Sequence, residues 1–158
     1  MGKAPNNYER SKQEHSNEIN EVRAQASLAR LHTILGDRLY KEWWAATFEQ
    51  EGGNAERFTW LQIRKAAHEK YESLPAHIHD AHDAWQNATF ALGNYVYSVS
   101  VHIYKQDDEK EAELRKALET AEAQYLAVCD QYQSTFECAC NGANRSACAC
   151  CAHTGENA

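Results

Sequence analysis

Apolar residues that recur at alternating spacings of three and four positions are the feature that most restricts the fold of this chain. One series runs between residues 78 and 99, and a second runs between residues 114 and 132. Their members are Ile78, Ala81, Trp85, Ala88, Leu92, Tyr95 and Val99, followed by Leu114, Leu118, Ala121, Tyr125, Val128 and Tyr132. This is the heptad spacing of helices that pack along one side. Because a short polar segment joins the two series, we expect an antiparallel helical hairpin.

A long helix is predicted upstream of the hairpin, over residues 11–50. Its apolar residues also recur at spacings of three and four, and Ser11 with Glu14 matches a capping box. Gly36 interrupts this segment and predicts either a bend or a boundary between two helices. The pair Gly52-Gly53 is expected to end it.

A shorter helix is expected between the long helix and the hairpin. Asn54 is its predicted N-cap, and Ser73-Leu-Pro75 is predicted to interrupt the pattern. Ser73 is expected to cap the next helix, with Pro75 in its first turn, where a missing N–H has little effect.

The segment Tyr95–Tyr104, YVYSVSVHIY, supports two interpretations. Its β-branched and aromatic residues alternate with polar ones, which is typical of a strand. No second convincing strand exists to pair with it, and a lone strand leaves its backbone groups unsatisfied. We therefore favour a helix here. The alternative is a strand shared with a second copy of the chain.

These patterns predict an all-α fold, a bundle of about four helices that includes a long N-terminal helix and a helical hairpin. The chain has 158 residues, with only two prolines and seven glycines, which suits one helical domain. The expected organisation is a flexible N-terminus (1–10), a helical bundle (11–136) and a Cys-rich tail (137–158) that resembles a zinc knuckle. Apolar stripes of this kind usually form the core.

The tail carries five of the six cysteines in the chain. The candidate metal ligands are Cys138, Cys140, Cys148, Cys150, Cys151 and His153. The segment has too few large apolar residues to form a core, so a tetrahedral zinc ion would supply the folding free energy that burial cannot. A closed shell of four ligands would make this zinc structural.

The arrangement Cys138-x-Cys140, ten residues, Cys151-x-His153 resembles the CxC…CxH pattern of the SWIM zinc-binding module. The resemblance covers 16 residues and implies a zinc ligand set. It departs from the module in its extra thiols, Cys148 and Cys150, and in the short sequence after His153. An all-thiolate set and a metallothionein-like site for a soft metal are alternatives. So are disulfides or unstructured thiols. Cys129 is expected to be a buried small residue.

A second, weaker metal-site candidate lies near the start of the hairpin. His79 and Asp83 are four residues apart, on one side of a predicted helix, and His82 lies at the edge of the apolar stripe. The three side chains could serve a metal-dependent enzyme. The alternative is a solvated, polar first turn. The sequence contains no HExxH, P-loop, GxGxxG or GxSxG motif.

The charge balance bears on the class of partner. The formal net charge is −7, which argues against a general nucleic-acid binder, since such proteins carry a basic surplus. No signal peptide and no membrane-spanning segment is apparent, so a cytoplasmic location is expected. The sequence therefore favours a non-enzymatic helical interaction or adaptor protein that forms a homodimer or binds a protein partner. A small viral or phage-type inhibitory or accessory protein is a further alternative.

Overall fold

The computed structural model describes residues 6–49 and 57–137, and 86% of these residues are helical. The four helices are α1 (Asn7–Phe48), α2 (Trp60–Glu72), α3 (Ala76–Ser100) and α4 (Asp108–Ser134). No strand occurs within the described ranges, so the all-α prediction is confirmed for them. Residues 7–10, expected to be flexible, belong to α1.

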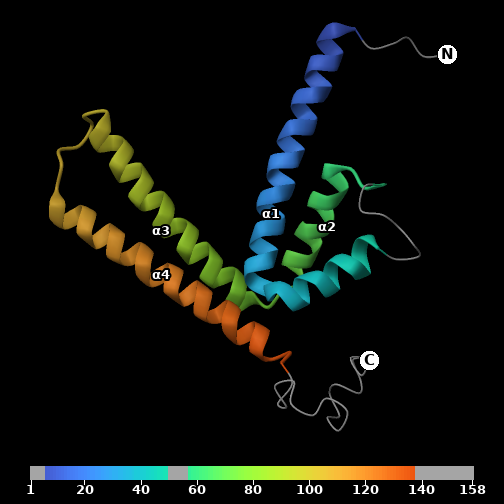
Figure 1. The fold of residues 1–158 in the computed structure, drawn as a ribbon. Helices are drawn as coiled ribbons and strands as arrows, with labels where there is room; N and C mark the ends of the chain where they lie inside the picture. The colour runs from blue at the N-terminus through green and yellow to red at the C-terminus, as the bar shows by residue number, and fades with distance from the viewer. Residues whose placement is uncertain (1–5, 50–56, 138–158) are drawn as a thin grey trace.

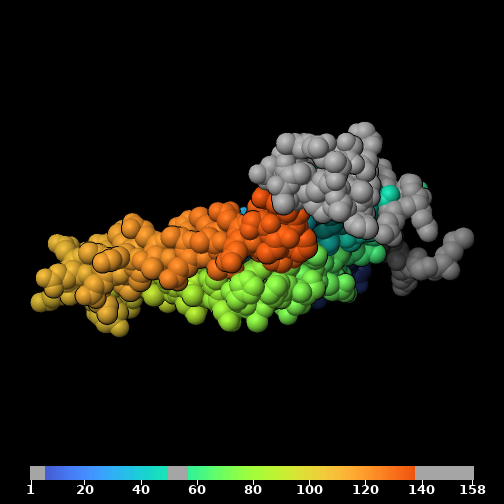
Figure 2. Space-filling model, turned by 90° about the horizontal axis from the view of Figure 1, so that it is seen from below, coloured from blue at the N-terminus to red at the C-terminus, as the bar shows by residue number. Residues whose placement is uncertain are grey.

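The helices form two arms that diverge from a common vertex (Figure 1). One arm contains α1 and α2, and the other is the hairpin of α3 and α4, while α4 also contacts α1. Seen from below, the hairpin extends as a narrow arm beyond the neighbouring helices (Figure 2). We call its part farthest from the vertex, residues 86–124, the distal arm.

Helix α1 bends at Gly36, as the sequence predicted. This glycine has φ 73° and ψ 173°, a backbone conformation that is essentially restricted to glycine. At this bend the side chain of Gln133 contacts the backbone of α1. Its Nε2 donates to the carbonyls of Thr33 and Ile34, each at 3.1 Å. The end of α4 therefore holds the bend in α1.

The capping residues differ from two of the sequence predictions. Helix α1 begins with a capping box of Asn6 and Glu9, not at Ser11. Helix α2 begins later than expected, because Thr59 rather than Asn54 is its N-cap. Thr59 forms a capping box with Gln62, in which each side chain accepts from the other residue's backbone N–H.

The junction between α2 and α3 also differs from the sequence prediction. Ser73 is the C-cap of α2, and its hydroxyl donates to the carbonyl of Lys70 at 2.6 Å. Pro75, and not Ser73, occupies the N-cap of α3 and makes no side-chain cap. Asp107 caps α4 by accepting from the backbone N–H of Lys110, and acidic residues occupy the first turn of that helix.

A single apolar cluster, the vertex cluster, joins all four helices. Its buried residues are Leu31, Ile34, Leu35, Ala67, Tyr71, Leu74, Ile78, Tyr125 and Cys129. A second cluster of Ala24, Phe48 and Ile63 fixes α2 between the two parts of the bent helix α1. Both clusters lie away from the distal arm. The core of this fold is therefore concentrated where the two arms meet.

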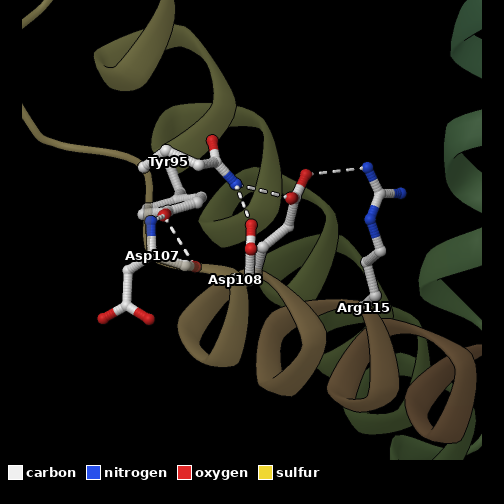
Figure 3. Close-up of polar contacts among 6 residues, drawn as sticks. Tyr95, Asp107, Asp108 and Arg115 are labelled. Atoms are coloured by element: carbon white, nitrogen blue, oxygen red, sulfur yellow. Dashed lines mark hydrogen bonds and ion pairs between the residues drawn. The ribbon is translucent and has the colours of Figure 1, made fainter.

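The tip of the hairpin is closed by one tyrosine. The Tyr95 hydroxyl accepts from the backbone N–H of Asp107 at 2.7 Å and donates to its carbonyl at 3.0 Å (Figure 3). Helix α3 continues to Ser100, and residues 101–104 form turns. The helical interpretation of Tyr95–Tyr104 is thus confirmed for its first six residues. The Asp108 and Arg115 side chains belong to a polar network on the first turns of α4 (Figure 3).

Candidate functional site

The outer face of α3 carries several exposed apolar side chains. Phe90 is 61% exposed, Tyr97 65% and Val101 44%. At about 100° per residue these three positions share one side of the helix, roughly opposite the buried Tyr95. Gly93 and Asn94 lie between them on the same side. A Cβ atom added at Gly93 would meet nothing within 4 Å, so the space beside this backbone is open.

The outer face of α3 lies in the longest uncharged part of the hairpin. No Asp, Glu, Lys or Arg occurs between Asp83 and Lys105, whereas α4 carries charged residues along most of its length. Burial of this face would remove apolar surface from water without removing a charged side chain from water. The uncharged run is visible in the sequence, but heptad spacing identifies only the inward-facing series.

The inward-facing series is itself incompletely covered in the distal arm. Leu92, Val99, Leu114 and Leu118 are all half-buried, because α3 and α4 are the only helices of the described ranges that enclose them. Tyr95 is the exception, with 8% exposure beneath the hairpin turn. The distal arm thus stands out from the core with apolar residues on two sides. Such a surface is suited to contact with another helix.

The histidines near the start of α3 occupy different environments. His82 is 3% exposed, and its Nδ1 lies 3.3 Å from the hydroxyl of Tyr71. Its ring also packs edge-on against Tyr125 and Trp85. Burial lowers the pKa of His82, and the nearby Arg30 charge lowers it further. His82 is therefore a neutral member of an aromatic cluster.

His79 and Asp83 do not join His82 in a ligand set. His79 donates from Nε2 to the carbonyl of Leu74 at 3.0 Å, and its ring packs edge-on against Tyr71. The Asp83 side chain is exposed, and its Oδ1 lies 3.7 Å from Nδ1 of His82. Among residues 6–49 and 57–137, no three His, Cys, Asp or Glu side chains are arranged to hold a metal ion. The second metal candidate therefore gains no support from the described residues.

The tail candidates lie outside the described residues. They are Cys138, Cys140, Cys148, Cys150, Cys151 and His153. Cys129 is a free, buried thiol that packs in the vertex cluster, as the sequence predicted. Burial raises the pKa of this thiol, which disfavours the nucleophilic thiolate.

None of the helices in the described ranges is long and apolar enough to cross a membrane. Comparison of the chain with protein-family models, with curated proteins and with solved structures found no match.

Proposed function

We propose that this chain is a non-enzymatic helical interaction protein that acts as a homodimer through the outer face of α3. The observation that carries the proposal is the exposed stripe of Phe90, Tyr97 and Val101 on an uncharged helix face. An exposed apolar stripe on a projecting helix is the kind of surface that marks an interaction site. Large apolar side chains at such positions supply the association free energy when they are buried.

The charge of the chain favours a second copy as the occupant. Each copy has a formal net charge of −7, so two copies repel each other over most of their surfaces. The outer face of α3 carries no charge, and contact there brings no two like charges together. A two-fold symmetric contact between the same face of both copies is the commonest form of homodimer.

The order of large and small residues also suits an antiparallel pairing of α3 with α3. Phe90 and Val101 lie near opposite ends of the stripe, so each would contact the other residue in the second copy. In that register Tyr97 would lie over Asn94 and beside Gly93 of the second copy, where the absence of a Cβ leaves open space. The stripe is therefore complementary to itself when one copy is reversed.

Sedimentation equilibrium tests the homodimer. We expect a wild-type dimer and a monomeric Tyr97→Glu variant, since the new carboxylate would lose its hydration within the contact. The matched control is Gln124→Glu, which adds the same charge at an exposed position of α4 and should leave the dimer intact. Circular dichroism should show equal helix content in all three proteins.

A wild-type chain that remains monomeric would contradict the homodimer. If a different protein then binds the chain and Tyr97→Glu abolishes that binding, the interaction function would stand with another occupant. If Tyr97→Glu changes neither self-association nor binding, the outer face of α3 is not the interaction surface.

The second part of the proposal concerns the Cys-rich tail. The CxC…CxH spacing between Cys138 and His153 supports a structural zinc ion that stabilises the tail. Elemental analysis of protein purified under reducing conditions should find one zinc per chain. Hydrogen exchange with and without a chelator should show loss of protection in the tail while the helical bundle stays protected. Thiols found as disulfides under those conditions would contradict the zinc site.

A further inference from the structure

A pocket of about 490 Å³ is lined by residues of α1, α3 and α4. These helices meet in the angle between the two arms (Figure 1). Its volume lies within the range of small-molecule sites. Its apolar lining includes Trp85 and Leu126, and its polar lining includes Ser27, Gln86 and Glu122. This pocket is separate from the outer face of α3.

Arg30 lines this pocket and is incompletely satisfied by the protein. Its Nε atom is buried and has no hydrogen-bond partner. The guanidinium carbon lies 3.6 Å from the ring centroid of Tyr71, so one face of the group is covered by an aromatic ring. A cation–π contact satisfies the face of a guanidinium but leaves its N–H donors unused. Burial of the Nε donor without a partner is costly, and an anionic ligand on the guanidinium would offset part of that cost through its charge.

The charges around the pocket limit the kind of anion. His82 also lines the pocket, and because burial and the Arg30 charge lower its pKa, it adds no positive charge at neutral pH. Glu122 is the one acidic side chain of the described lining, and it would repel a multiply charged anion. Arg30 is the one cationic side chain there. The arrangement favours one negative charge on a ligand with an apolar body.

We propose that this pocket binds a small organic monocarboxylate, with its carboxylate on the N–H groups of Arg30 and its apolar body against Trp85 and Leu126. The planar guanidinium can donate two parallel hydrogen bonds to a carboxylate. The stacking of Arg30 on Tyr71 and the stacking of Trp85 on Tyr125, with ring centroids 5.3 Å apart, hold both recognition groups in place. A preorganised site loses less side-chain entropy when it binds.

Isothermal titration of the full chain with benzoate at pH 7.5 tests this site, with benzamide and phenyl phosphate as comparison probes. We expect benzoate to bind at least about tenfold more tightly than benzamide, which has the same ring but no charge. Phenyl phosphate should bind more weakly than benzoate because of Glu122. The indole N–H resonance of Trp85, assigned with a Trp85→Phe variant, should shift on titration and thereby locate the bound probe.

Three variants identify the residues responsible. Arg30→Met should weaken benzoate binding at least about tenfold, whereas Arg23→Met, an equal change at an exposed position of α1, should leave it unchanged. Arg30→Lys keeps the charge but lacks the planar set of N–H donors. Its affinity for benzoate should therefore lie between those of wild type and Arg30→Met. Glu122→Gln should strengthen binding by about two- to threefold, since it removes a like charge.

Equal binding of benzoate and benzamide would overturn the proposal, since the pocket would then recognise only the apolar ring. Unchanged binding in Arg30→Met would also overturn it. If Arg30→Met does not fold, two other results would overturn the proposal. One is benzoate binding that Glu122→Gln does not strengthen. The other is a Trp85 indole resonance that does not shift when benzoate is added to the wild type. None of these measurements depends on whether the chain dimerises.

Discussion

The two ends of the α3–α4 hairpin have the same apolar spacing but very different burial. At the vertex, Ile78 and Cys129 are almost completely buried because α1 and α2 cover them. In the distal arm, Leu92 and Leu118 continue the same series and are only half-buried, since no third helix of the described chain lies over them. The comparison shows that a heptad pattern indicates which side of a helix faces a partner. It does not indicate how many helices enclose that side.

The largest expected effect is a difference between the vertex and the distal arm in the response to truncation. Ile78→Ala should reduce the free energy of unfolding by about 2–5 kcal/mol, because a fully buried side chain leaves a cavity. Leu118→Ala should cost about 1 kcal/mol, since the site is half-exposed and water can fill the space. Urea denaturation measures both values. Equal losses would show that Leu118 is as deeply buried as Ile78, as it would be in a dimer that covers the seam.

The second effect is a loss of stability expected at the bend in α1. Gly36→Ala should reduce the free energy of unfolding by about 1–3 kcal/mol, because the positive φ is strained for alanine. The new Cβ would also lie 2.6 Å from Oε1 of Gln133. Thermal denaturation measures the loss. An unchanged melting temperature would mean that the bend relaxes without cost and that Gln133 does not hold it.

Much of this fold was predictable from local sequence. The helical segments follow from apolar spacing, and the bend at Gly36 follows from a glycine inside a long helix. Local patterns failed at Thr59 and Ser73, because several residues in each junction can act as caps and the packing of α2 selects among them. The choice of cap is therefore decided partly by tertiary structure.

The candidate sites were less predictable than the helices. Arg30, Trp85 and Glu122 meet in one pocket although they come from three helices, and nothing in their spacing brings them together. The sequence marks His82 as a candidate residue, but its burial against Tyr71 depends on how α2 and α3 are placed in the fold. The uncharged run that contains Tyr97 was visible in the sequence. Its exposure became apparent only with the path of the hairpin.

The third prediction concerns the response of the vertex to acid. Burial lowers the pKa of His82 below its ordinary value, so the unfolded chain takes up a proton at a higher pH than the folded chain does. The contribution of neutral His82 to the free energy of unfolding is complete above the ordinary histidine pKa of about 6.5. This contribution is lost as the pH falls below that value and through the pKa of His82 in the folded chain. The groups around His82 that carry or can acquire charge are Arg30 of α1, Tyr71 of α2, His79 and Asp83 of α3, and Tyr125 of α4.

Urea denaturation at pH 7.5 and pH 5.5 tests this contribution. His82→Gln should reduce the loss of stability between the two pH values, because the titrating group is gone. His68→Gln is the matched control, since His68 is an exposed residue of α2 whose side chain lies 3.7 Å from Glu72. It should leave the loss unchanged. An equal acid response in wild type and His82→Gln would show that His82 is not the group responsible.

The smallest expected effect has the opposite sign and belongs to the distal arm. Gly93 lies within α3, and a Cβ atom there meets nothing within 4 Å. Gly93→Ala should therefore stabilise the monomer by about 0.5–1 kcal/mol, because alanine loses less backbone entropy in a helix. The measurement is best made in the Tyr97→Glu background, where self-association is removed. In the wild-type background the same methyl group would occupy the space that Tyr97 of a second copy requires, so dimerisation should weaken while the monomer gains stability. Destabilisation of the monomer would instead show that another part of the chain already covers Gly93, and the outer face of α3 would then not be free for a partner.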